Sequence, residues 1–97
     1  GEGVTQDYKE AEKWYRLAAE QGDPEAQYNL GVMYDTGKGV TQDFVRAHMW
    51  FNIVAGNGIE EAKKYREIVA NEMTPTQIAD AERMARDCEK KKYKSCE

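Results

Sequence analysis

The chain has 97 residues, of which 40% are hydrophobic, and its formal net charge is −4 at pH 7. This length allows one small domain with a modest core. The mild acidity gives no reason to expect a nucleic-acid partner, because proteins that bind nucleic acids usually carry a basic face. No apolar run is long enough to cross a bilayer, so we expect no transmembrane segment. Helix-forming residues abound while Val, Ile and Thr are sparse, which predicts an all-α fold.

The first predicted helix covers residues 8–21. Its apolar residues recur at the three- and four-residue spacing of a helix with one buried face, at Ala11, Trp14, Tyr15 and Ala18. Gly22 follows and supplies the left-handed backbone conformation that ends many helices. The segment is therefore expected to be an amphipathic helix that buries Trp14 and Tyr15.

The second predicted helix covers residues 24–35. Asp23 is its expected N-cap, and Pro24 occupies the first helical position, where a missing N–H costs nothing. The residues expected to be buried are Ala26, Leu30, Met33 and Tyr34. Gly31 interrupts this helix at a cost of roughly 1 kcal/mol relative to alanine. We expect a neighbouring helix to approach the backbone closely at Gly31.

An internal repeat organises the first two thirds of the chain. The string at residues 3–8, Gly-Val-Thr-Gln-Asp-Tyr, recurs at residues 39–44 with Phe in the last place, an offset of 36 residues. The same offset relates Trp14 to Trp50, and it persists through further aromatic, Ala and Gly positions. A glycine-rich loop and a third helix over residues 43–55 are therefore expected, with Trp50 and Phe51 in the core.

These residues carry a family resemblance. The string Glu25-Ala-Gln-Tyr-Asn-Leu-Gly-Val-Met-Tyr34, followed by Gly37-Lys-Gly-Val40 and by Ala47-x-x-Trp50-Phe51, resembles the Sel1-like repeat, a relative of the tetratricopeptide repeat. The resemblance implies a right-handed superhelix of antiparallel helix hairpins, here of about five helices, that serves as a scaffold for protein complexes. Many such proteins are bacterial, and some are secreted or membrane-associated. Because the chain opens inside a repeat, we expect it to be the C-terminal part of a longer array.

The repeat pattern fades after residue 58. The helix predicted over residues 59–71 has Arg66 and Glu67 where the previous copy has Leu30 and Gly31. A last helix starts at Thr74-Pro-Thr-Gln77, a capping box in which the Thr hydroxyl and the Gln side chain cap each other's backbone. One face of this helix carries Ile78, Ala81, Ala85 and Cys88. The expected organisation is a truncated repeat over 1–22, a full repeat over 23–58, and a two-helix cap with a basic tail over 59–97.

No constellation of residues predicts catalysis. His48 is the only histidine and matches Glu12 in the earlier copy, so it is expected on the solvent side of its helix. Cys88 and Cys96 lack the further ligands that a zinc site requires. They could form a disulfide that closes a small loop, or remain as two free thiols, and a disulfide would indicate a periplasmic or secreted protein rather than a cytoplasmic one. We therefore expect no enzyme activity, no metal and no cofactor.

The four lysines at 90–92 and 94 are expected to interact with the negative end of the last helix and to keep the tail soluble.

The ligand that we expect for this chain is a protein or peptide. In the tetratricopeptide architecture the first helix of each pair lines the concave face, and the resemblance implies that role for Glu25, Tyr28, Asn29, Val32, Asp35, Lys64 and Ile68. Packing or capping within the hairpin is the alternative for Tyr28 and Asn29. A further alternative is self-association through the uncovered apolar side of the first helix, with no peptide ligand.

Overall fold

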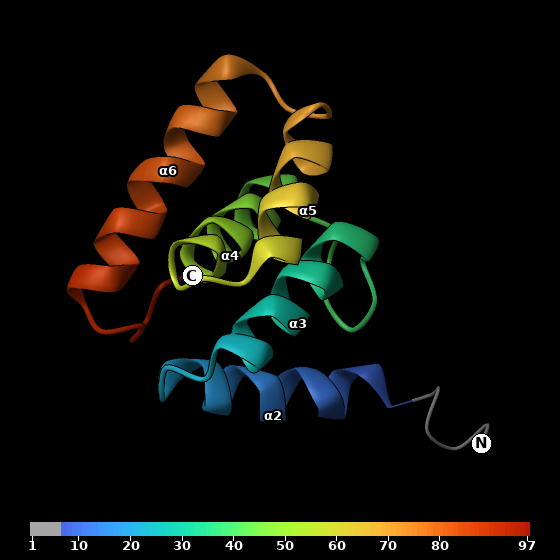
Figure 1. Cartoon of the computed structure of the whole chain (residues 1–97). Helices are drawn as coiled ribbons and strands as arrows, with labels where there is room; N and C mark the ends of the chain where they lie inside the picture. Colours follow the sequence, from blue (N-terminus) through green and yellow to red (C-terminus); the bar gives the residue numbers. More distant parts are fainter. Residues whose placement is uncertain (1–6) are drawn as a thin grey trace.

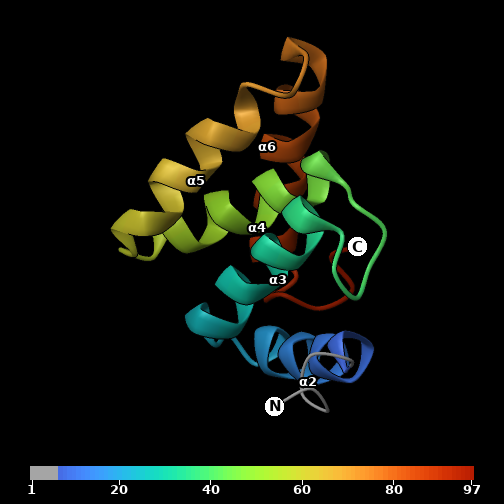
Figure 2. The same cartoon turned by 90° about the vertical axis from the view of Figure 1, so that its right-hand side faces the viewer.

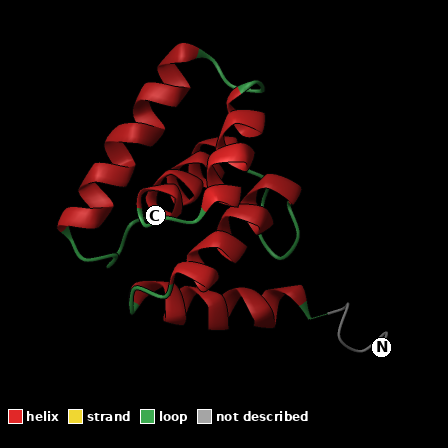
Figure 3. Cartoon of the chain, in the orientation of Figure 1, coloured by secondary structure: helices red, strands yellow, loops and turns green. Residues whose placement is uncertain are grey.

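A computed structural model describes residues 7–97, and this part of the chain consists of helices and loops without strands (Figure 3). The helices are α2 (Tyr8–Glu20), α3 (Pro24–Thr36), α4 (Phe44–Gly56), α5 (Glu60–Ala70) and α6 (Pro75–Lys90). The bounds of the first four of these helices, and the start of α6, lie within a residue or two of those predicted from the sequence. Residues 3–6 of the first repeated string lie outside the described part.

The predicted helix boundaries form through local backbone interactions. Gly22 has a φ of 92° in the turn after α2, and the Asp23 carboxylate accepts a hydrogen bond from the Glu25 amide at 3.1 Å. At the start of α6, the Thr74 hydroxyl accepts from the Gln77 amide at 3.1 Å, and the Gln77 side chain accepts from the Thr74 amide at 2.9 Å. The capping box is thus confirmed. All of these contacts span three residues or fewer, which explains why the sequence pattern was sufficient to predict them.

Helix α4 is the centre of the core. It packs against α3, α5 and α6, whereas α2 packs mainly on α3 (Figures 1 and 2). In Figure 1, α3 and α5 lie in front of α4, and α2 crosses below. The buried side chains of α4 are Ala47, His48, Met49, Trp50, Phe51, Ile53 and Val54. Because helices surround it, α4 is apolar on nearly all sides.

The close approach expected at Gly31 is present. A Cβ atom at this position would lie only 2.7 Å from Cε1 and 2.9 Å from Cδ1 of Phe51 on α4. Phe51 is fully buried, so its ring fills the space that a larger residue on α3 would need. Gly31 therefore allows α3 and α4 to pack closely, which compensates for its low helix propensity.

The last helix pair departs from the tight hairpins that precede it. Helices α5 and α6 diverge from their connecting loop, and α6 packs on α4 (Figure 1). Arg66, which replaces the buried leucine of the previous copy, remains half-buried and donates to the Asn52 side chain at 2.8 Å. Glu67, at the place of Gly31, is exposed. The position of that glycine therefore faces solvent in this copy of the repeat.

Two predictions about burial were wrong. Trp14 was expected in the core but is 63% exposed, because α2 packs mainly on α3 within residues 7–97, whereas its counterpart Trp50 lies on α4, which packs against three helices. His48 was expected at the surface but is only 3% exposed, because α5 and α6 both pack on α4. In both cases the local sequence pattern is the same in the two copies of the repeat. The neighbouring helices therefore determine whether the side chain is buried or exposed.

None of the helices within residues 7–97 is long and apolar enough to traverse a lipid bilayer.

Candidate interaction surfaces

An aromatic cluster joins α3, α4 and α5. The ring of Tyr28 lies 5.8 Å from that of Phe51 and 6.0 Å from that of Tyr65, and the Phe51 and Tyr65 rings are 5.9 Å apart. Burial raises the pKa of Tyr28, and the neighbouring Tyr65 and Glu61 raise it further. Tyr28 is therefore packed against two other rings while remaining half-buried. A rigid, half-buried tyrosine of this kind is well suited to contact a partner.

Exposed side chains extend this cluster along α5. Tyr65 is 37% exposed and Ile68 is 49% exposed, and Lys64 on the same helix is also exposed. These residues and Tyr28 form what we call the α3–α5 face. Glu25, one turn before Tyr28 on α3, is exposed at its edge. The face therefore combines apolar and aromatic surface with charged side chains at its border.

Asn29 and Val32 lie toward α2. Together with Asp7, Tyr8, Ala11, Tyr15 and Met33 they line a cavity of about 280 Å³ between α2 and α3. Asp35, at the end of α3, is half-buried, and burial together with the nearby Glu72 raises the pKa of its carboxyl. Six of the seven residues predicted to bind a partner are thus divided between the α3–α5 face with its edge and this neighbouring cavity, whereas Asp35 belongs to neither.

Cys88 and Cys96 form a disulfide, and their Cα atoms are 4.9 Å apart. The residues after α6 turn back over the helices. The Lys94 ammonium group donates to the Glu20 carbonyl at 2.7 Å, and the Tyr93 ring lies against Gly22. Lys94 therefore interacts with the end of α2 and not with the end of α6, because the disulfide turns the tail back across the stack.

The tail carries Glu97 into a polar pocket between α2, α3 and α4. Its carboxylate accepts from the Trp50 indole N–H at 2.9 Å and forms an ion pair with Arg16 at 2.7 Å. It also accepts a hydrogen bond from the Tyr34 hydroxyl. Burial by itself would lower the pKa of Arg16, but hydrogen bonds to Tyr34 and Glu97 outweigh burial and raise it. The three partners of Glu97 lie 47 to 81 residues before it in the sequence. Apart from the neighbouring Cys96, the sequence therefore offered no indication of this site.

The buried His48 occupies a separate position under α5 and α6. Its Nδ1 atom has no hydrogen-bond partner in the described structure. Burial and the nearby Arg66 lower its pKa, while Glu82 and Glu67 oppose this shift. Among residues 7–97, no three side chains of His, Cys, Asp or Glu come together as a metal site.

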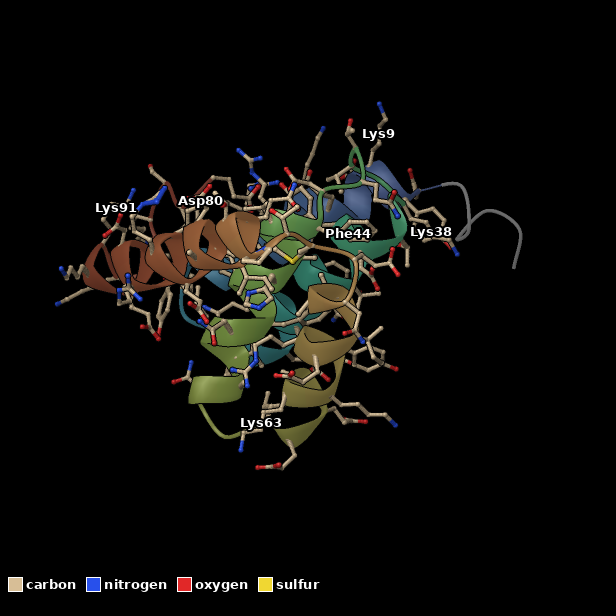
Figure 4. The ribbon with its side chains drawn as sticks, turned by 90° about the horizontal axis from the view of Figure 1, so that it is seen from above. Lys9, Lys38, Phe44, Lys63, Asp80 and Lys91 are labelled. Carbon is tan, nitrogen blue, oxygen red and sulfur yellow. A yellow bond between two sulfur atoms is a disulfide. The ribbon has the colours of Figure 1, made fainter. Side chains whose placement is uncertain are left out.

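The lysines are dispersed over the surface. Figure 4 shows Lys91 at the end of α6, with Lys9 and Lys38 at the opposite end of the molecule and Lys63 on α5. Lys38 lies over the Tyr8 ring, with its Nζ atom 5.5 Å from the ring centre. Lys91, Lys63 and the pair Lys9 and Lys38 therefore lie on three separate parts of the molecule.

Comparison with known proteins provides a family for this fold. The Sel1 repeat matches residues 1–23 and 24–58. A search of curated proteins finds no match. Among solved structures, the chain is similar to c5321, a protective antigen present in uropathogenic Escherichia coli strains that displays an SLR fold. The two are 32% identical with a TM-score of 0.83, over 92% of this chain and 19% of that protein. With the repeat matched over more than half of its residues, the chain belongs to the Sel1 repeat family.

Proposed function

We propose that the chain binds a protein or peptide partner on the α3–α5 face and in the adjoining cavity. Sel1 repeats and the SLR fold generally serve as non-enzymatic scaffolds for protein interactions. The observation that carries the proposal is the exposed apolar surface of Tyr65 and Ile68 beside the rigid Tyr28 ring. Because packing already holds the Tyr28 ring, a partner that covers this ring costs little further conformational entropy.

The adjoining cavity supplies a polar contact. The Asn29 side chain lines it, and its amide can both donate to and accept from the backbone of an extended peptide. Val32 lies one turn further along α3 and adds apolar surface. A peptide that crosses α3 from the cavity to the α3–α5 face would contact Asn29, Tyr28 and Ile68. The disulfide supports a location in an oxidising compartment.

A displayed random peptide library selected against the intact chain provides ligands for the test. Affinities of the selected peptides would then be measured for Asn29→Ala and Ile68→Ala, with Arg86→Ala on the exposed side of α6 as the control. We expect roughly tenfold weaker binding for each of the first two variants and no change for the control. Equal affinity for all three variants, or failure to select any peptide, would contradict the proposal.

A second candidate function is self-association through α2. Trp14 is 63% exposed and Leu17 is 56% exposed, although the residues 36 positions later, Trp50 and Ile53, are buried. The apolar side of α2 is therefore suited to another helix, and a second copy of the chain could supply it. Sedimentation over a range of concentrations would show association of the native chain that Leu17→Ser weakens. A monomer at all concentrations would exclude this function.

A further inference from the structure

Three helices each direct one hydrogen-bond donor toward the same carboxylate. Arg16 comes from α2, Tyr34 from α3 and Trp50 from α4, and all three contact the side-chain oxygens of Glu97. Arg16 also donates to the Tyr34 oxygen at 3.1 Å, which orients the hydroxyl hydrogen toward Glu97. Donors that converge from two successive repeats in this way form a prearranged site for an anionic, planar group.

The group that fills this site does not belong to the repeats. Glu97 lies beyond α6, on a tail in which Lys92, Tyr93 and Ser95 have φ values of 55°, 69° and 53°. The disulfide at Cys96 holds the tail in place. The donors are thus part of the helical stack, while the carboxylate reaches them on a tethered segment.

The site has unmet hydrogen-bonding capacity when Glu97 is withdrawn. Arg16 would keep its ion pair with Glu12, and Arg46 would keep Asp43 at 2.6 Å, so these charges would balance. The Trp50 indole is 2% exposed, however, and its N–H has Glu97 as its acceptor. A buried donor without an acceptor favours the binding of a replacement.

An open cavity of about 430 Å³ is lined by Arg16, Tyr34 and Glu97, and it gives a ligand access to the position of the Glu97 carboxylate. We propose that the Arg16–Tyr34–Trp50 pocket is a carboxylate-binding site, that Glu97 is its intramolecular ligand, and that it accepts the carboxylate of another polypeptide when the tail is displaced. The site is separate from the α3–α5 face and does not depend on the function proposed for that face.

The test follows the Trp50 indole N–H by NMR. Trp14→Phe leaves Trp50 as the only tryptophan, and because Trp14 is 63% exposed this change should preserve the fold. N-acetylglutamate α-amide, which carries only a side-chain carboxylate, would be added to the Trp14→Phe chain with and without Glu97→Ala. Sodium chloride at equal ionic strength is the control. We expect a saturable shift of the Trp50 resonance in the Glu97→Ala chain, none with chloride, and little change where Glu97 is retained.

Adding Arg16→Met to the Glu97→Ala chain should weaken binding at least about tenfold, since it removes a charged donor. Should Glu97→Ala fail to fold, the isosteric Glu97→Gln would be titrated, because the added carboxylate is a better acceptor than the amide. N-acetylalanine, which carries only a terminal carboxylate, would show whether the site prefers an acidic side chain or a chain terminus, and binding of either supports the proposal. Absence of a saturable shift with both compounds would overturn it, as would an equal response to chloride, since Glu97 would then be only a structural contact.

Discussion

Replacing Gly31 with alanine tests the close packing of α3 against α4. The new Cβ would lie 2.7 Å from Cε1 of Phe51, whereas ordinary contacts begin at 3.4 Å, so the ring or helix must move by about 0.7 Å. Phe51 cannot move freely because the rings of Tyr28 and Tyr65 pack against it. Overpacking of this kind costs about 1–3 kcal/mol, and the better helix propensity of alanine returns at most about 1 kcal/mol.

We therefore expect Gly31→Ala to lower the free energy of unfolding by about 1–2 kcal/mol, which corresponds to a fall in Tm of roughly 5–10 °C. Urea and thermal unfolding followed by circular dichroism, with the disulfide intact, would measure both quantities. Gly56→Ala is the matched control, because Gly56 is also helical and a Cβ there would meet nothing within 4 Å. It should leave stability unchanged or slightly increased.

A Gly31→Ala chain as stable as the native chain or the Gly56→Ala control would show that alanine fits at this position without overpacking. A double-mutant cycle identifies the cause. Phe51→Leu removes the ring atoms nearest the new Cβ, so the Gly31→Ala effect should be at least halved in that background. An undiminished effect would show that the cost arises from some contact other than Phe51.

Three further predictions concern the cap, the tail and the buried histidine. Cys96→Ser should lower the free energy of unfolding by about 2–3 kcal/mol, because it opens the short loop to Cys88. A urea midpoint equal to that of the oxidised native chain would contradict this. Thr74→Ala should cost about 1 kcal/mol in the same assay, while Thr74→Ser, which keeps the hydroxyl cap on Gln77, should cost less. Burial lowers the pKa of His48 in the folded chain below its ordinary value of 6.5. As the pH falls below 6.5, the unfolded chain therefore binds a proton at His48 more readily than the folded chain, and the free energy of unfolding falls. Unfolding in urea between pH 7.5 and 5.5 should show this loss, at no more than about 1.4 kcal/mol per pH unit, and His48→Gln should reduce it. A native chain whose stability does not fall over that range would refute the assignment.

Much of the secondary structure could be predicted because its causes lie within a few residues of each other. Asp23 and Thr74 cap helices through contacts of two or three residues, and the apolar spacing of a helix repeats every three or four. Gly31 was predictable as a point of close approach, since a glycine inside a helix requires compensation. Only the structure shows that close packing against the Phe51 ring provides this compensation.

The candidate sites were predicted less completely. The α3–α5 face follows from the family resemblance, but the stacking that holds Tyr28 against Tyr65 depends on how α3 and α5 meet. The cysteine spacing was compatible with both a disulfide and two free thiols. The Glu97 pocket could not be foreseen, because an acidic residue in a polar tail resembles any other solvated charge until the chain turns back.

The sequence by itself determined the repeated helical unit, its capped boundaries and its family, because periodicity and capping are properties of neighbouring residues. Only the tertiary structure decided which equivalent positions are buried. Trp14 and Trp50 occupy the same place in their repeats, yet one is 63% exposed and the other 2%. Burial depends on the helices that surround a residue, and the surroundings of α2 and α4 differ. The same physical reason explains the buried His48 and the carboxylate of Glu97 in its pocket: segments distant in the sequence supply what surrounds them.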